Sequence, residues 1–139
     1  MSEVVSVRLS DQVAQRLRER AADDDEAVSG LAQRLVDEGL RMEAHPSIIF
    51  RPGPSGRRAA LMRGPDVWEV IGLVRSLDAS GEAAIVEAAQ WLGLAQAQVR
   101  AALGYYGAFP EEIDTHVAAN QAAAERAQRE WETQQRLLG

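Results

Sequence analysis

Residues 3 to 9 alternate between two faces, and this period of two predicts one short β-strand. Val5, Val7 and Leu9 fall on the same face of that strand. A single strand leaves hydrogen-bonding groups unpaired on both edges, and the roughly forty residues around it cannot enclose a core. This feature limits the fold more than any other, because the partner strand must come from elsewhere. We expect a second copy of the chain to supply it.

Two helical patterns follow the strand pattern. Ser10 is a good N-cap for the first helix, whose apolar spacing continues to the acidic run at 23–26. The second helix is expected to start at Val28 and to end near Gly39, or after Met42 if it continues through that glycine. The predicted order of this first segment is therefore strand, helix, helix.

Two stretches of the first segment carry a resemblance to a known family. They are Val-Ser-Val-Arg-Leu-Ser at 5–10 and Ser-Gly-Leu-Ala-Gln-Arg-Leu-Val at 29–36. Over residues 3–42 the chain resembles the ribbon-helix-helix family of transcriptional repressors and antitoxins, in which two chains pair their N-terminal strands into a ribbon that enters the DNA major groove. The resemblance implies DNA contacts from Val4, Ser6, Arg8 and Ser29.

Arg8 is the strongest single candidate for base recognition. A guanidinium can donate two hydrogen bonds to guanine, Ser6 can donate or accept, and Val4 can offer only an apolar contact. The family usually has Ser or Thr at the cap of the second helix, where backbone N–H groups hold a phosphate. This chain has Asp-Glu-Ala at 25–27 instead. Because an acid repels a phosphate, a ribbon that dimerises without binding DNA is the alternative.

Residues 45–65 form a separate, basic stretch. Two short apolar runs flank a segment rich in Pro and Gly, which predicts a β-hairpin. The stretch carries four arginines and no acid, although the whole chain has a net charge of −6. Such a hairpin could lie along a phosphate backbone or against an acidic protein, and a solvated tip is the alternative. The arginines are Arg51, Arg57, Arg58 and Arg63, of which Arg57 and Arg58 are the candidate DNA contacts.

Three helices are expected next, over 65–77, over 82–92, and from Ala95 to Gly104 or beyond. Gly93 separates the second from the third at helix-turn-helix spacing. Any packed pair of Ala-rich helices joined through Gly has the same spacing, so we favour a packing role over DNA reading. A DNA-reading role would expose Gln96, Gln98 and Arg100.

The stretch from His45 to Asn120 also resembles a family of unknown function that is associated with antitoxins. Its members begin His-Pro-x-Ile, continue through a hairpin and end with an Ala-Leu-x-Tyr-Tyr helix. Such domains look like VapB-type antitoxins, which are typically encoded beside toxins with a PIN-like ribonuclease fold. The matching residues are His-Pro-Ser-Ile at 45–48, Val-Trp-Glu-Val-Ile at 67–71, Val-Arg-Ala-Ala-Leu-Gly-Tyr-Tyr at 99–106 and Pro-Glu-Glu-Ile-Asp at 110–114.

A long polar helix is predicted from Pro110 to Leu138, because this segment has no internal Gly or Pro. Its apolar residues follow a four-three spacing, and several gather near the end, where little chain is left to cover them. That end suggests a docking surface for the toxin, with packing on the hairpin domain or a coiled coil in the dimer as alternatives. The candidate toxin-binding residues are Ile113, Val117, Trp131, Leu137 and Leu138.

The chain offers no catalytic constellation. It has no Cys, no Gly-rich phosphate loop, and only two histidines, His45 and His116, which are most simply structural or solvated. We therefore expect no enzymatic activity, no cofactor and no metal site. No apolar run approaches the roughly 20 residues of a membrane span, and the first residues are acidic with no apolar segment after them. A soluble, cytoplasmic protein is expected.

Together these patterns predict a mainly α protein with short β segments. The expected parts are a ribbon-helix-helix dimer (1–44), a β-hairpin plus helix-turn-helix-like helical domain (45–109) and a long C-terminal helix (110–139). The expected function is that of a type II antitoxin, which binds operator DNA as a homodimer or higher even oligomer and neutralises a PIN-like ribonuclease toxin. A stand-alone ribbon-helix-helix repressor without a toxin is the alternative, and a dimerisation and adaptor module is a third.

Overall fold

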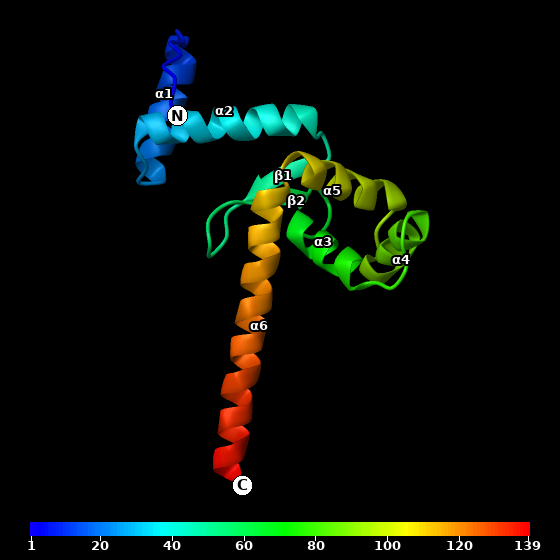
Figure 1. Cartoon of the computed structure of the whole chain (residues 1–139). Helices are drawn as coiled ribbons and strands as arrows, with labels where there is room; N and C mark the ends of the chain where they lie inside the picture. Colours follow the sequence, from blue (N-terminus) through cyan, green and yellow to red (C-terminus); the bar gives the residue numbers. More distant parts are fainter. The chain divides into compact units, whose positions relative to one another are not determined.

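The computed structural model describes all 139 residues and consists of six helices and one two-stranded antiparallel sheet. This confirms the expectation of a mainly helical protein with short β segments. The chain divides into two compact units, residues 1–43 and 44–139, whose elements are labelled in Figure 1. None of the helices combines the length and the apolar character that crossing a membrane requires.

The first unit is built from two helices, α1 (Asp11–Asp23) and α2 (Val28–Ala44). Ser10 caps α1 as predicted, because its side-chain oxygen accepts a hydrogen bond from the Val13 N–H over 3.3 Å. α2 continues through Gly39, since one glycine weakens a helix without ending it. The helix stops shortly before Pro46, where a proline disfavours helical backbone in the residue before it.

Residues 1–10 form no strand in the single chain and are exposed throughout. The strand expected over 3–9 is therefore absent from this structure. The physical reason is that strand pairing needs a second edge, and the two strands of the structure already pair with each other in the other unit. The segment keeps its alternating sequence but has no partner that could separate one face from the other.

The second unit begins with the predicted hairpin. Its strands are β1 (Ile48–Arg51) and β2 (Arg58–Leu61), which pair antiparallel with Ile48 opposite Leu61. The turn between them is closed by a hydrogen bond from the Gly56 N–H to the Gly53 carbonyl over 3.0 Å. Gly56 has a φ of 106°, a conformation that favours glycine, so the Pro- and Gly-rich composition matches the turn it makes.

Four helices complete the second unit: α3 (Val67–Ser76), α4 (Glu82–Leu92), α5 (Gln96–Ala108) and α6 (Pro110–Leu138). All four were predicted. Gly93 ends α4 in the left-handed conformation, with a φ of 65°, as the turn between α4 and α5 requires. The fully buried core lies between the hairpin and these helices, and Tyr105 is its largest fully buried side chain; among its other members are Ile48, Leu61, Val67, Val70, Val99 and Ala102.

α6 has two parts with different surroundings. Its first turns pack against α3 and α5, and Ile113 is only 1% exposed. From residue 118 onward every residue is exposed, so the chain covers little of the rest of the helix. Packing on the hairpin domain, one of the alternatives for this helix, therefore describes its beginning only, and Figure 1 shows the red end projecting from the other elements of the second unit.

Candidate functional site

The N-terminal segment carries the residues that were predicted to contact DNA bases. Val4, Ser6 and Arg8 are exposed, and so are Val5 and Val7 on the opposite face of the expected strand. The structure thus leaves both faces open in the single chain. The apolar face has nothing to cover it within its own unit.

An apolar groove runs between α1 and α2 in the same unit. It encloses about 370 Å³, and apolar side chains form most of its wall. The sequence pattern places Leu35 and Val36 on the inward stripe of α2, yet Val36 is 62% exposed. Two helices alone cannot enclose this stripe, so the unit retains an uncovered apolar surface. The residues that line the groove are Leu9, Val13, Arg16, Leu17, Arg20, Ala32, Leu35 and Val36.

The acidic turn before α2 is partly neutralised by arginines. Arg34 donates a hydrogen bond to Glu26 over 3.1 Å, and Arg20 lies 2.9 Å from a carboxylate oxygen of Asp24. The hydrogen bond with Glu26 is the main reason why the pKa of Arg34 is raised. Ser29 is exposed in the first turn of α2, as a phosphate contact requires. The repulsion expected from this turn is therefore weaker than the sequence alone suggests.

The arginines of the basic hairpin are mostly engaged with their own unit. Arg51 donates to the carbonyls of Leu61 (3.2 Å) and Gly64 (3.3 Å). Arg57 is exposed and donates to the Phe50 carbonyl over 3.4 Å. The hairpin is therefore held together by several of the charges that the sequence suggested for phosphate contacts.

Arg58 differs most from its expected role. Its Nε lies 2.5 Å from a carboxylate oxygen of Asp66, and only 27% of its side chain is exposed. The far end of the side chain lies against Gly53, where a β carbon would overlap it. The structure therefore places Arg58 in an internal ion pair and not on an open face that could follow a phosphate backbone.

Asp66 organises the start of α3. It is 6% exposed and accepts a hydrogen bond from the Trp68 indole N–H over 3.1 Å. The Glu69 carboxylate in turn accepts a hydrogen bond from the Asp66 backbone N–H over 3.1 Å, which completes a capping box. The sequence Asp-Val-Trp-Glu at 66–69 thus ties an acid, an indole and a second acid together at one helix end.

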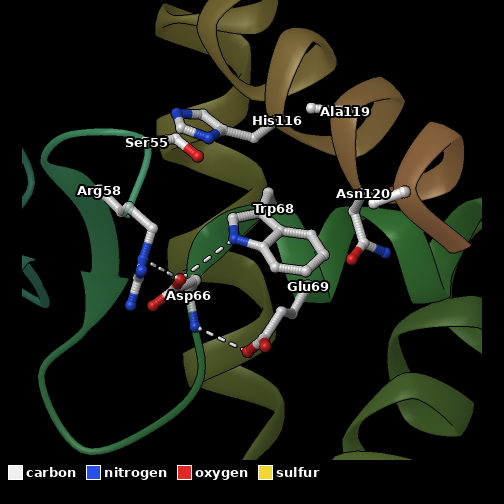
Figure 2. A pocket seen from close by; sticks show the side chains of 9 residues that line it. Ser55, Arg58, Asp66, Trp68, Glu69, His116, Ala119 and Asn120 are labelled. Atoms are coloured by element: carbon white, nitrogen blue, oxygen red, sulfur yellow. Dashed lines mark hydrogen bonds and ion pairs between the residues drawn. The ribbon is translucent and has the colours of Figure 1, made fainter. Parts of the chain in front are cut away.

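An open pocket of about 350 Å³ lies beside this helix end, between the hairpin tip and α6. Figure 2 shows the Trp68 indole between Asp66 and Asn120, with His116 on one side and Glu69 on the other. The pocket walls are Ser55 and Arg58 from the hairpin, Asp66, Trp68 and Glu69 from the start of α3, and His116, Ala119, Asn120 and Ala123 from α6.

Sequence reasoning missed this pocket. His116 is interpreted from the sequence as structural or solvated, and Asn120 only marks the end of a family resemblance. A signal was present, because residues 116, 119, 120 and 123 share one face of a helix. The partners across the pocket come from residues about fifty positions earlier, and no local pattern relates those two parts of the chain.

The α4–α5 pair has few side chains free for reading bases. Arg100 is in an ion pair with Glu82, and the Gln98 amide hydrogen-bonds to the backbone of Ala95 and Arg63. Gln96 alone of the three candidates has no such contact and is exposed. This arrangement agrees with the packing role that the sequence favoured for the pair.

Three helices are joined at the surface by one polar cluster. Arg75 of α3 donates to the Tyr106 hydroxyl over 2.7 Å and forms an ion pair with Asp114 of α6. The Tyr106 hydroxyl donates to Asp114 over 3.0 Å. The hydrogen bond from Arg75 is the main reason why the pKa of Asp114 is lowered, and the same bond raises the pKa of Arg75. The cluster fixes the beginning of α6 on α3 and α5.

The candidate toxin-binding residues fall into two groups. Ile113 is buried and Val117 is half-buried against the core, so the single chain leaves Ile113 no exposed surface for docking and leaves Val117 only part of its side chain. The reason is that one helical stripe is covered at its start by α3 and α5 and uncovered at its end. Trp131, Leu137 and Leu138 are exposed, and Leu137 reaches 87% exposure.

No group of three or more metal-ligating side chains comes together in the structure. Comparison of the chain with protein-family models, with curated proteins and with solved structures finds no match. The case for a function therefore rests on the surfaces described above and on the sequence resemblances.

Proposed function

We propose that this protein is a type II antitoxin, which dimerises and binds operator DNA through its first unit and neutralises a toxin through its second unit. The observation that carries the proposal is the uncovered apolar surface of the first unit. Leu9, Leu35 and Val36 line the groove between α1 and α2 and are each at least 43% exposed. Contiguous exposed apolar surface of this kind marks a protein–protein interface.

A second copy of the chain is the natural cover for that surface. Two copies related by a two-fold axis would place residues 3–9 of one chain antiparallel to the same residues of the other. Each segment would then supply the edge that the other lacks, and Val5, Val7 and Leu9 would turn toward the helices. This is the arrangement that the resemblance to ribbon-helix-helix proteins implies.

The opposite face of the paired segments would carry Val4, Ser6 and Arg8 toward DNA. The exposed start of α2, with Ser29 in its first turn, could hold a phosphate by its backbone N–H groups. The ion pairs of Glu26 with Arg34 and of Asp24 with Arg20 support this use, because they reduce the negative charge that faces the phosphate.

The toxin would bind the distal part of α6. Trp131, Leu137 and Leu138 expose apolar side chains on a helix that no other part of the chain covers. An amphipathic helix with exposed anchors commonly binds by entering an apolar groove of its partner. That the toxin has a PIN-like ribonuclease fold is an inference from the resemblance of residues 45–120 to domains of antitoxins.

A stand-alone repressor would use the same first unit without a toxin. The second unit adds little to such a repressor, because Arg58 and Arg100 are held in ion pairs with Asp66 and Glu82. A separate task for the second unit, as in an antitoxin, accounts better for its exposed helix. A short toxin gene next to this one would favour the antitoxin, and its absence would favour the repressor.

Sedimentation equilibrium of the full chain tests the dimer directly. We expect a dimer at micromolar concentration. Val36→Glu should be a monomer, because dimerisation would bury the new carboxylate between the two copies without a partner. Met62→Glu is the matched control, since Met62 is equally apolar and exposed but lies in the second unit. A folded monomer for the unchanged chain at the same concentration would overturn the proposal.

A further inference from the structure

The pocket between the hairpin tip and α6 has an uncompensated negative charge. Four titratable groups face it: Arg58, Asp66, Glu69 and His116. The charges of Arg58 and Asp66 cancel each other in their ion pair. Glu69 accepts a hydrogen bond from a backbone N–H but forms no ion pair, so its carboxylate is the one formal charge of the pocket without a cation.

The pocket also has an aromatic surface. The Trp68 indole N–H donates to Asp66, so the polar edge of the ring already has its hydrogen-bond partner. The rest of the ring borders the pocket between Glu69 and the α6 residues Asn120 and His116 (Figure 2). A cation near an indole face is attracted by the electrons of the ring, and the attraction is stronger where water is excluded.

Three further hydrogen-bonding side chains complete the pocket. Ser55, His116 and Asn120 line it, and the side chains of all three lack a hydrogen-bond partner in the protein. Each can accept a hydrogen bond from a bound donor. The α6 side of the pocket includes the small side chains of Ala119 and Ala123, which leave room for a partner's side chain to enter along the helix.

We propose that this pocket binds the guanidinium group of an arginine side chain that belongs to a protein partner. An anion would meet the carboxylates of Asp66 and Glu69, and a neutral group would leave the charge of Glu69 uncompensated. A guanidinium can donate both to the Glu69 carboxylate and to the side-chain oxygens of Ser55 and Asn120, and its flat shape suits an indole face. The inference goes beyond the proposed function, since it holds for any partner with an accessible arginine.

The test uses the full chain and a blocked arginine, N-acetyl-arginine-N-methylamide, as the probe. The chain has three tryptophans, so the indole N–H signals of Trp68, Trp91 and Trp131 can be followed together by NMR. We expect a saturable shift of the Trp68 signal with a dissociation constant on the order of 1 mM, as for one side chain binding alone. The exposed Trp91 and Trp131 serve as internal controls and should not shift.

The uncharged analogue with citrulline in place of arginine separates charge from shape. It should bind at least tenfold more weakly than the arginine probe. Glu69→Gln should weaken binding of the arginine probe at least threefold, while the side-chain oxygen of Gln can still accept the Asp66 N–H. Glu125→Gln, at an exposed position farther along α6, is the matched control and should bind like the unchanged chain.

Two results would overturn the proposal: equal binding of the citrulline analogue, or no saturable shift of Trp68 in a chain whose melting temperature is normal. Free L-arginine identifies the source of the guanidinium. Binding of the blocked arginine as tightly as free L-arginine supports a side chain within a protein. Free L-arginine binding more than tenfold tighter would overturn the assignment to a protein partner and identify a small-molecule site.

Discussion

Arg75 donates a hydrogen bond to the hydroxyl oxygen of Tyr106 over 2.7 Å, and the same hydroxyl donates to Asp114 over 3.0 Å. The hydroxyl of Tyr106 thus forms hydrogen bonds both with a cation of α3 and with a carboxylate of α6. The ion pair between Arg75 and Asp114 helps to hold the beginning of α6 on α3. Because this ion pair needs a charged Asp114, the attachment is sensitive to pH.

Asp114→Asn should make that sensitivity visible. The pKa of Asp114 is lowered below its ordinary value of 3.8 in the folded protein, chiefly by Arg75. The stabilisation is therefore present above about pH 4 and is lost as the pH falls through the folded-state pKa. We expect Asp114→Asn to lower the melting temperature at pH 7 and the difference from the unchanged chain to shrink toward pH 3.

Calorimetry between pH 7 and pH 3 measures the difference in melting temperature. We expect the difference to be small, because the side chains of Arg75 and Asp114 are nearly half exposed and solvent screens their charges. Asp78→Asn is the charge-matched control, since Asp78 is exposed in the loop after α3 and forms no ion pair. A constant difference between Asp114→Asn and the unchanged chain over the whole range would contradict the prediction.

Asp66→Ala should destabilise the second unit strongly. The substitution removes the cap of α3, the acceptor of the Trp68 indole and the partner of Arg58. Removing one partner of a buried ion pair and a helix cap should together cost about 2–4 kcal/mol of unfolding free energy. Denaturant unfolding measures the loss, with Asp78→Ala as the control. A loss below about 1 kcal/mol would show that Asp66 does not organise the start of α3.

Ile113→Ala should lower the free energy of unfolding, whatever its effect on binding to a partner. Ile113 is buried in the core of the second unit, and truncating a buried isoleucine typically costs about 2–5 kcal/mol. Leu137→Ala is the apolar control at an exposed position of the same helix and should change the unfolding free energy by less than about 0.5 kcal/mol. Equal, small effects of both substitutions would contradict the placement of Ile113 in the core.

Trp131→Ala should leave the free energy of unfolding nearly unchanged and weaken binding to the toxin. Its side chain is 55% exposed, so the unfolding free energy should stay within about 0.5 kcal/mol of the unchanged chain. If the distal part of α6 docks the toxin, affinity for the toxin should fall roughly thirtyfold, as for other aromatic anchors of interfaces. Trp91→Ala, also an exposed tryptophan but on α4, is the matched control. Unchanged toxin affinity for Trp131→Ala would move the docking surface away from α6.

Arg8→Ala should weaken binding to DNA from the region upstream of the gene. Loss of a guanidinium that reads guanine should cost about 1–3 kcal/mol and relax the sequence preference. Arg18→Ala removes the same charge from an exposed position of α1 and should leave that preference intact. The measurement is a gel-shift titration with matched and scrambled DNA. A larger effect of Arg18→Ala than of Arg8→Ala would exclude the N-terminal segment as the reading element.

The helices were predictable because their signals are local. Ser10, Gly93 and Pro110 each act on the backbone within a few residues, and each marks a helix end in the structure as it does in the sequence. The hairpin was predictable for the same reason. The strand over residues 3–9 is different, since its pairing depends on a second edge that the single chain does not contain.

Local patterns could predict neither the pocket nor which part of the apolar face of α6 is buried. A stripe such as Ile113, Val117 and Trp131 shows that one face of a helix prefers to be covered, but it does not show what covers each position. Arg58 and Asp66 illustrate the same limit: the sequence indicates a basic hairpin and a helix cap separately, and only the folded chain brings their side chains together.

The uncovered part of α6, from Gln121 to Leu138, extends over about 27 Å at the rise of an α-helix. With few tertiary contacts, its stability comes mainly from helix propensity and from local pairs such as Gln128 with Glu132, so it follows a helix–coil equilibrium of its own. Its amide hydrogens should exchange with solvent far faster than those of α3 or α5, without global unfolding. This end of the chain can therefore melt, be captured or be cut while the core around Tyr105 stays intact.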